Sequence, residues 1–402
     1  MNFAVVTGAG AQAKQVTTGG SHTCALLVDG RVRCWGDASD GQLGYGNRNP
    51  VPPDEFPTSR GDVNVGGQVV QIDAAYRHTC ALLSTGSVRC WGQGSQGQLG
   101  YGNTNSIGDD ELPSSAGDVS VGGQVAQIAG GFFHTCALLS TGRVRCWGSG
   151  EFGQLGYGNT NFIGDDELPS SAGDVNVGGQ VVQIAAGGFH TCALLSTGRV
   201  RCWGKGEHGQ LGYGNTNFIG DDELPSSAGD VSVGGQVVQI AATRSTHTCA
   251  LLSTGRVRCW GAGPDGQLGY GNTNWIGDNE LPSSAGDVNV GGQVVQIAAG
   301  RNHTCAVLSA GSVRCWGNGV ALGYGNTNMI GNDEPPSSAG DVNVGGPVVQ
   351  IATGDSHTCA LLSARSIRCW GDGSSGKLGY LGLANIGDDE LPSSAGDVPL
   401  TP

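Results

Sequence analysis

Short runs in which apolar and polar residues alternate recur along the whole chain and predict strands. In the unit from Gln180 to Gly235, QVVQIA (Gln180 to Ala185) alternates, HTCALL and RVRCW are rich in β-favouring residues, and DVSVGG (Asp230 to Gly235) closes the unit. A glycine-containing turn, residues 196–198, separates the second run from the third. Apolar residues at every second position, in runs separated by such turns, are typical of strands. The unit is therefore predicted to hold four antiparallel strands.

This unit occurs seven times. The first cysteines of the copies are Cys24, Cys80, Cys136, Cys192, Cys249, Cys305 and Cys359, at spacings of 56, 56, 56, 57, 56 and 54 residues. Such a register indicates one structural element copied along the chain. No linker, charge run or shift of composition interrupts it, so we expect a single domain over residues 1–402.

The predicted sheets are apolar on both faces, because alternate residues of HTCALL point to opposite sides. Each sheet must then stack against a neighbour on either side, and the first and last units carry the same apolar strands as the middle ones. A closed ring removes both exposed ends. The prediction is an all-β, seven-bladed β-propeller with four antiparallel strands per blade. A parallel β-helix is the alternative, and either FAVVT (residues 3–7) or DVPLT (residues 397–401) could supply the last outer strand.

Composition agrees with an all-β protein and limits the function classes. The chain has 74 glycines, 15 prolines and 13% charged residues, which suits many short strands joined by turns. Its formal net charge of −14 would repel nucleic-acid phosphates, so no nucleic-acid partner is expected. No apolar run is long enough to span a bilayer, and the N-terminus lacks the basic segment of a secretion signal.

The two cysteines of each unit are predicted to face each other. Counting outward from the turn at residues 196–198, Leu194 faces Val200 and Cys192 faces Cys202, at a site where Cα atoms come within about 4.5 Å. Reduced cysteines packed as small hydrophobes, and zinc, are the alternatives. The expected disulfides are Cys24 to Cys34, Cys80 to Cys90, Cys136 to Cys146, Cys192 to Cys202, Cys249 to Cys259, Cys305 to Cys315 and Cys359 to Cys369. Because disulfides persist in oxidising compartments, they favour an extracellular, periplasmic or cell-surface location.

Other repeated side chains are interpreted as structural, because a feature present in every blade serves the blade. Seven of the eight histidines precede TC, and seven of the eight tryptophans lie in CWG. The arginine of each RC pair is expected to contact blade carboxylates such as Asp62 or Asp118. One turn departs from the repeat, since Arg365 stands where the other units have glycine.

Differences between the copies fall at three places: before the histidine, after CWG, and before IG. Because strand direction alternates, all three are expected at one face of the disc. Aromatic residues, Met and Arg are typical of binding interfaces, although these loops could also vary without a function. The candidate partner-binding residues are Tyr76, Phe132, Phe133, Phe152, Phe162, Phe189, His208, Phe218, Arg244, Trp275, Arg301 and Met329.

An acidic triplet follows the third strand in four units, for example Asp109-Asp110-Glu111 and Asp165-Asp166-Glu167, and partial copies follow it in the other three. A ring of such triplets would attract a basic partner. Plain solvation of the loops is the simpler interpretation. Calcium is a further alternative, but no EF-hand or nonapeptide spacing is present.

The segment HTCALLSTGRVRCWGSGEFGQLGYGN, with its HT-AL, G-V--WG and GQLG blocks, resembles the repeat of the RCC1-like (regulator of chromosome condensation) propellers, in particular bacterial ones with cysteines at these places. The resemblance covers nearly the whole chain and implies the same seven-bladed fold. The RCC1-like propellers have in common that they present loops on a rigid disc to another protein. The exchange-factor activity of some of them is not expected here, because only scaffold blocks match.

The favoured function is that of a non-enzymatic, monomeric propeller that binds a protein with a basic patch. No catalytic residues, metal or cofactor are assigned. One alternative is an enzyme, a lyase or hydrolase acting at the central channel, and a unique polar cluster at one end of the channel would favour it. The other is a purely structural module of a surface protein.

Overall fold

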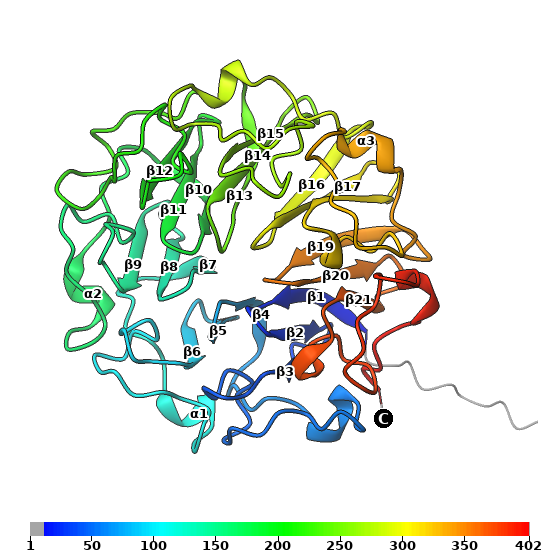
Figure 1. The fold of residues 1–402 in the computed structure, drawn as a ribbon. Coiled ribbons are helices and arrows are strands. Elements are labelled where there is room, and N and C mark those ends of the chain that lie inside the picture. The colour runs from blue at the N-terminus through cyan, green and yellow to red at the C-terminus, as the bar shows by residue number, and fades with distance from the viewer. Residues whose placement is uncertain (1–11, 402) are drawn as a thin grey trace, which may run out of the picture.

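The computed structural model describes residues 12–401, which form seven β-sheets placed around a central axis (Figure 1). The segment FAVVT, one candidate for the closing strand, lies outside the described residues. Each sheet has three antiparallel strands in sequence order. The strands are β1 (Ala13–Thr18), β2 (His22–Leu27), β3 (Val32–Gly36), β4 (Val69–Ala74), β5 (His78–Leu83), β6 (Val88–Gly92), β7 (Val125–Gly130), β8 (His134–Leu139), β9 (Val144–Gly148), β10 (Val181–Ala186), β11 (His190–Leu195), β12 (Val200–Gly204), β13 (Val237–Ala242), β14 (His247–Leu252), β15 (Val257–Gly261), β16 (Val294–Ala299), β17 (His303–Leu308), β18 (Val313–Gly317), β19 (Val348–Thr353), β20 (His357–Leu362) and β21 (Ile367–Gly371).

The few helices are single turns. Most begin at the proline of PSS or PTS, whose fixed φ and missing N–H suit a first helical position. They are α1 (Pro113–Ala116), α2 (Pro169–Ala172), α3 (Pro336–Ala339) and the 3₁₀ turns η1 (Pro57–Arg60), η2 (Pro282–Ser284), η3 (Gly319–Ala321), η4 (Ser374–Gly376) and η5 (Pro392–Ser394). None of the helices among residues 12–401 could cross a lipid bilayer.

The prediction of a full fourth strand in each unit was wrong for the described residues. Segment 230–235 meets its sheet only at an isolated bridge between Val231 and Val200. The N–H of Val231 donates to Val200, but the next available N–H, that of Val233, turns back to the carbonyl of Val231. Gly234 then adopts a φ of 81°, which redirects the chain before a second ladder pair can form. DVPLT likewise has a single backbone bond to its sheet, from the N–H of Val398 to the carbonyl of Ile367.

Two sets of hydrogen bonds join neighbouring sheets near the axis. The glutamine of the first strand donates to the first strand of the next sheet, as Gln127 does to the carbonyl of Ile184 at 2.9 Å. Each repeated histidine bonds to a threonine hydroxyl of the next sheet, as His78 does to Thr135 at 2.8 Å. Both sets also link the last sheet to the first, through Gln350 to the carbonyl of Val16 and through His357 to Thr23.

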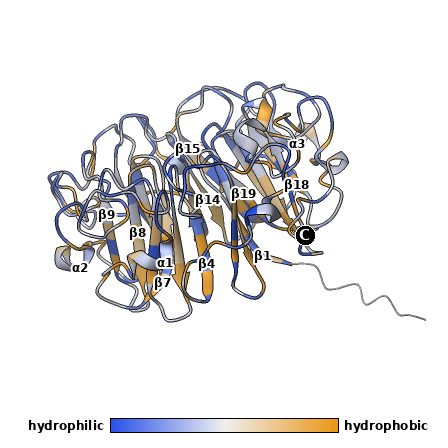
Figure 2. Ribbon diagram, turned by 90° about the horizontal axis from the view of Figure 1, so that it is seen from below, coloured by the Kyte–Doolittle hydropathy of each residue, from blue (hydrophilic) through white to orange (hydrophobic). Residues whose placement is uncertain are grey.

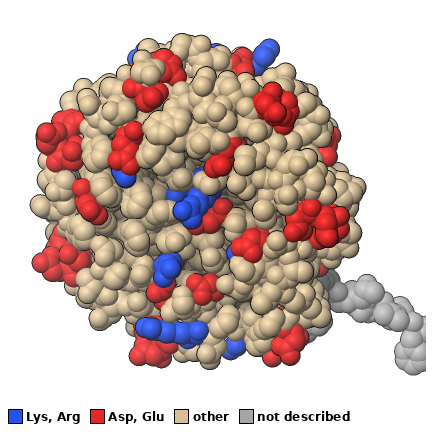
Figure 3. Space-filling model, viewed as in Figure 1, with Lys and Arg blue, Asp and Glu red and all other residues tan. Residues whose placement is uncertain are grey.

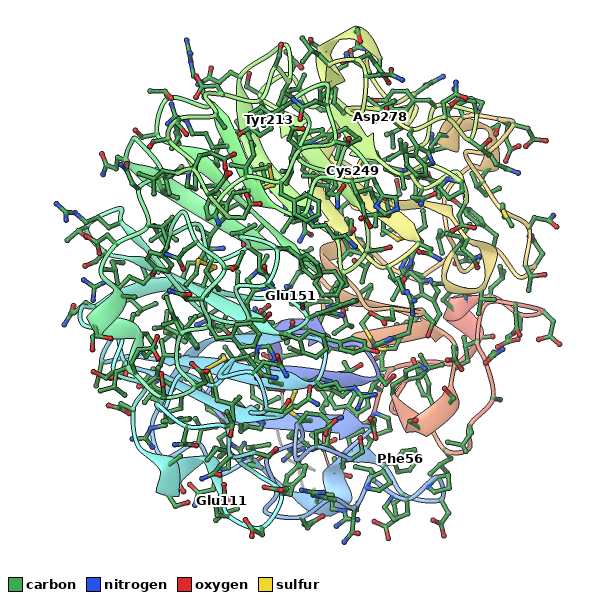
Figure 4. All side chains as sticks on the ribbon, turned by 60° about the vertical axis from the view of Figure 1, so that its left-hand side comes forward. Phe56, Glu111, Glu151, Tyr213, Cys249 and Asp278 are labelled. Atoms are coloured by element: carbon green, nitrogen blue, oxygen red, sulfur yellow. A yellow bond between two sulfur atoms is a disulfide. The ribbon has the colours of Figure 1, made fainter. Side chains whose placement is uncertain are left out.

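All seven predicted disulfides are present, each between cysteines that face each other in the second and third strands. The predicted register is confirmed: Cys192 faces Cys202 and Leu194 faces Val200. The Cα atoms of Cys192 and Cys202 are 4.1 Å apart. Figure 4 shows one such cysteine, Cys249, inside its sheet.

The repeated tryptophans and arginines hold the sheets in the way that the sequence suggests. Trp147 is fully buried and donates through Nε1 to the carbonyl of Gln98 in the preceding unit, at 3.0 Å. Arg89 pairs with Asp118 at 2.8 Å, and Arg33 pairs with Asp62 at 2.7 Å. Arg365 takes the left-handed conformation, with φ 65°, in the turn where the other units have glycine.

Candidate partner-binding face

Strand direction places the variable segments at one end of the sheets. In the fourth unit, β10 ends and β11 begins beside residues 187–189, while β12 ends just before Lys205. The segment before IG is held at the same end, because the N–H of Gly204 donates to Ile219. In side view, long loops cover this end and short turns cover the other (Figure 2).

Aromatic residues from three consecutive units meet on this face. Tyr76 and Phe132 have ring centroids 4.4 Å apart, and Phe132 and Phe189 are at 5.2 Å. Phe152 extends the series, at 5.2 Å from Phe189 and 6.0 Å from Phe218. All these rings are half-buried. We call this group the aromatic cluster: Tyr76, Phe132, Phe133, Phe152, Phe189 and Phe218.

A basic side chain lies over the cluster. The ammonium of Lys205 is 5.0 Å from the ring centre of Phe152 and 5.7 Å from that of Phe189. Lys205 also pairs with Glu207 at 2.5 Å. Cations over aromatic faces are attracted by the ring quadrupole. The cluster therefore offers a partner apolar area beside the ion pair of Lys205 and Glu207.

A second aromatic contact lies one unit further along. His208 and Trp275 have ring centroids 4.9 Å apart, and Trp275 is 40% exposed. Burial lowers the pKa of His208, and Lys205 lowers it further, while Glu207 opposes the shift. Met329 is exposed, and Phe162 is half-buried with no ring contact among the described residues.

Arg244 differs from the other candidates, because its side chain turns inward. Its Nη2 donates to the carbonyls of Thr18 and Ala74, at the ends of β1 and β4, so a residue of the fifth unit reaches the first two units. Its Nη1 is buried. Burial lowers the pKa of Arg244, while Asp355 and Asp73 oppose that shift. The extra residue in the fifth unit, visible as the 57-residue spacing, is the sequence signal of this insertion.

The repeated histidines are buried and neutral. Each is at most 1% exposed, and burial lowers the pKa of His78 and His134 to about 3. Thr135 donates its hydroxyl hydrogen to the carbonyl of Gln98 at 2.9 Å. Its oxygen must then accept from Nε2–H of His78, which fixes the tautomer. The contacts of these histidines agree with a structural role.

The acidic triplets lie on the long connections, and Figure 4 shows Glu111 at the outer edge of the molecule. In four of them the carboxylate oxygens lie within 4.8 Å of one another. Burial, and then the neighbouring aspartates, raise the pKa of Glu111, Glu167 and Glu223 to about 7. In the view of Figure 1, acidic side chains spread over the face to its edge and basic ones gather in a few places, one of them central (Figure 3).

The sequence did not predict a polar cavity on the same face. It has a volume of about 420 Å³ and lies over the segments that precede the histidines of units one, two, six and seven. Its charged lining residues are Asp37, Arg77, Arg301, Asp355, Asp372 and Lys377. Two signals mark the place in the sequence: the 54-residue spacing after Cys305, and Lys377 where five units have glutamine.

Seven sheets joined around an axis, with varied loops at one end, define a repeat propeller that presents a loop face. Two profiles of the regulator of chromosome condensation (RCC1) repeat match the chain. One matches residues 13–42, 69–98, 125–154, 181–210, 237–267, 294–325 and 348–377, and the other matches residues 29–82, 85–138, 141–194, 197–251 and 254–307. The chain belongs to the RCC1 repeat family.

Similar proteins of known sequence differ widely in size. The ultraviolet-B receptor UVR8 of Arabidopsis thaliana is 31% identical over 369 residues, which cover 90% of this chain and 78% of UVR8. The E3 ubiquitin-protein ligase HERC2 of Homo sapiens is 32% identical over 294 residues, which cover 72% of this chain but only 6% of HERC2.

Solved structures share the fold at low identity. Human WBSCR16 superposes with a TM-score of 0.69 at 22% identity, covering 89% of this chain and 92% of its own. Prp20p of Saccharomyces cerevisiae, described with its binding to Gsp1p and histones, superposes with a TM-score of 0.65 at 23% identity, covering 85% of this chain and 80% of its own.

Proposed function

We propose that this chain is a non-enzymatic scaffold that binds a protein partner through its variable face. The aromatic cluster is the observation that carries the proposal. Aromatic side chains dominate the hot spots of protein interfaces, where a few central residues supply most of the binding energy. Here the varied residues of three units come into contact with one another, while the opposite end holds near-identical turns. Trp275, Arg301 and Met329 extend the proposed surface, and Phe162 and His208 line its edge.

Arg244 is left out of the proposed surface, because its guanidinium is engaged with backbone carbonyls. The acidic triplets add a negative rim, which would steer a partner with a basic patch. The ligase activity of HERC2 belongs to a much longer protein, and no enzymatic role is proposed for this chain.

The remaining features of the proposal concern assembly and location. We infer that residues 1–402 form a single closed domain, a monomeric seven-bladed propeller. It neither binds nucleic acid nor inserts into a membrane. The bonds from Gln350 to Val16 and from His357 to Thr23, which link the last sheet to the first, support closure. The seven disulfides suit an oxidising compartment, so the proposed setting is a bacterial periplasm, cell surface or medium.

Affinity capture tests the proposal. The native chain and the variant Phe132→Ala/Phe189→Ala/Trp275→Ala are immobilised and exposed to envelope and medium fractions of the source organism. A matched control, Val182→Ala/Val238→Ala/Val295→Ala, removes exposed apolar side chains from the first strands. The proposal expects a protein captured by the native chain and the control but lost by the aromatic variant. Equal capture by all three, or none by the native chain, would favour a purely structural module.

A further inference from the structure

The polar cavity owes its existence to a shortened loop. Between the glycine of CWG and the leucine of LG, the sixth unit has four residues, Asn318 to Ala321, where the third unit has six, Ser149 to Gln154. In the third unit that loop supplies Phe152, which covers Phe189. The seventh unit has Ser356 at the position of Phe189, the sixth unit has no counterpart of Phe152 to cover it, and the short loop of the sixth unit forms one wall of the cavity.

The lining of the cavity is charged but balanced. Asp37, Asp355 and Asp372 supply three carboxylates, and Arg77, Arg301 and Lys377 supply three cations. Some of these charges are already paired, since Lys377 contacts Asp372 at 2.5 Å and Arg77 contacts Asp40 at 3.1 Å. Asp37 accepts hydrogen bonds from Ser39 and Gln42 but has no cationic partner among the described residues.

Asp355 is the cavity residue that interacts with two arginines: burial raises its pKa, and the buried Arg244 and the exposed Arg301 oppose that shift. Its side chain is only 12% exposed, and its Oδ1 is buried without a hydrogen-bond partner among residues 12–401. The nearest cation, Nη1 of Arg301, lies 3.9 Å from the other carboxylate oxygen, too far for a hydrogen bond. A buried acceptor of this kind is costly unless a donor reaches it. Arg301 is 56% exposed and free to turn toward a ligand.

We propose that this cavity binds a free α-amino acid. The ammonium group would donate to Asp355 and the carboxylate would accept from Arg301. A ligand with both charges on one carbon matches two opposite protein charges that lie 3.9 Å apart, and the volume falls within the range of about 300 to 1,000 Å³ that is usual for small-molecule sites. A ligand with one charge would bind only to Asp355 or only to Arg301. The cavity shares Tyr76 and Arg301 with the proposed partner-binding surface, but binding of an amino acid does not require the protein partner.

Isothermal titration calorimetry with glycine and L-serine at millimolar concentrations tests the proposal, with acetate and methylamine as probes of single charge. Arg301→Gln changes an exposed side chain and should leave the fold intact. It should weaken amino-acid binding roughly tenfold or more, as expected for the loss of one charge-assisted hydrogen bond. Arg48→Gln, at an exposed arginine that pairs with Asp109 instead, should bind as the native chain does.

A second variant keeps the test independent of one substitution. Asp355→Asn should also weaken binding roughly tenfold, provided that circular dichroism shows the native fold; if it does not fold, the result for Arg301→Gln decides. The proposal is overturned if the native chain binds neither glycine nor L-serine, if Arg301→Gln binds as tightly as the native chain, or if acetate or methylamine binds as tightly as glycine.

Discussion

Replacing Thr135 by valine tests whether the histidine-to-threonine bonds hold the sheets together. Thr135 and His78 are fully buried, and the threonine hydroxyl both accepts from His78 and donates to the carbonyl of Gln98. Valine keeps the shape but removes the hydroxyl. The carbonyl of Gln98 retains its bond from Nε1 of Trp147 at 3.0 Å, whereas Nε2–H of His78 loses its acceptor.

The expected cost follows from that one orphaned donor. An unsatisfied buried polar group destabilises a protein by about 1 to 3 kcal/mol, so Thr135→Val should lower the free energy of unfolding by that amount. Urea unfolding, followed by circular dichroism and tryptophan fluorescence, measures it. Thr104→Val, at an exposed threonine on a loop, should stay within about 0.5 kcal/mol of the native chain. The reasoning is refuted if both variants unfold with the native free energy.

Three further predictions concern the cross-links, one turn and the acidic loops. Cys136→Ala/Cys146→Ala should lower the free energy of unfolding by about 2 to 4 kcal/mol; in the native chain, alkylation without reductant should modify none of the 14 cysteines, and mass spectrometry that found them all modified would contradict the pairing. Arg365→Gly should raise the free energy of unfolding in urea by about 1 kcal/mol, because a left-handed φ favours glycine; an unchanged value would count against strain at this turn. The pKa of Glu167 is raised to about 7 in the folded chain. Its contribution to the free energy of unfolding is therefore complete below the pKa that it has in the unfolded chain, and is lost as pH rises through 7. Stability between pH 5 and 8 should therefore fall less steeply in Glu167→Gln, and an identical pH profile would refute the shift.

The sequence predicts the repeat, the strand register and the cysteine pairs because these features depend on local alternation. Counting outward from one turn places Cys192 opposite Cys202, since each residue of a hairpin has one facing position. The missing fourth strand shows the limit of this reasoning. Segment 230–235 alternates like a strand, but Gly234 and the bond from Val233 back to Val231 end its pairing after one bridge.

The candidate site could be predicted only in part. Strand direction shows which loops share a face, and the aromatic contacts agree with it. Contacts across the axis depend on how the seven sheets are arranged around it, and no local pattern reports that. For this reason the sequence did not show that Arg244 reaches the carbonyls of Thr18 and Ala74, or that a shortened loop beside Asn302 leaves a polar cavity.

Hydrogen exchange on the captured complex tests the central claim most directly. Amide exchange is compared between the free chain and the chain bound to its partner. The account predicts protection of the segments that carry Tyr76, Phe132, Phe189 and Trp275, with unchanged exchange in the turns at residues 196–198 and in their counterparts at the opposite end. Protection confined to those turns, or no change at the aromatic cluster, would contradict a partner-binding role for the variable face.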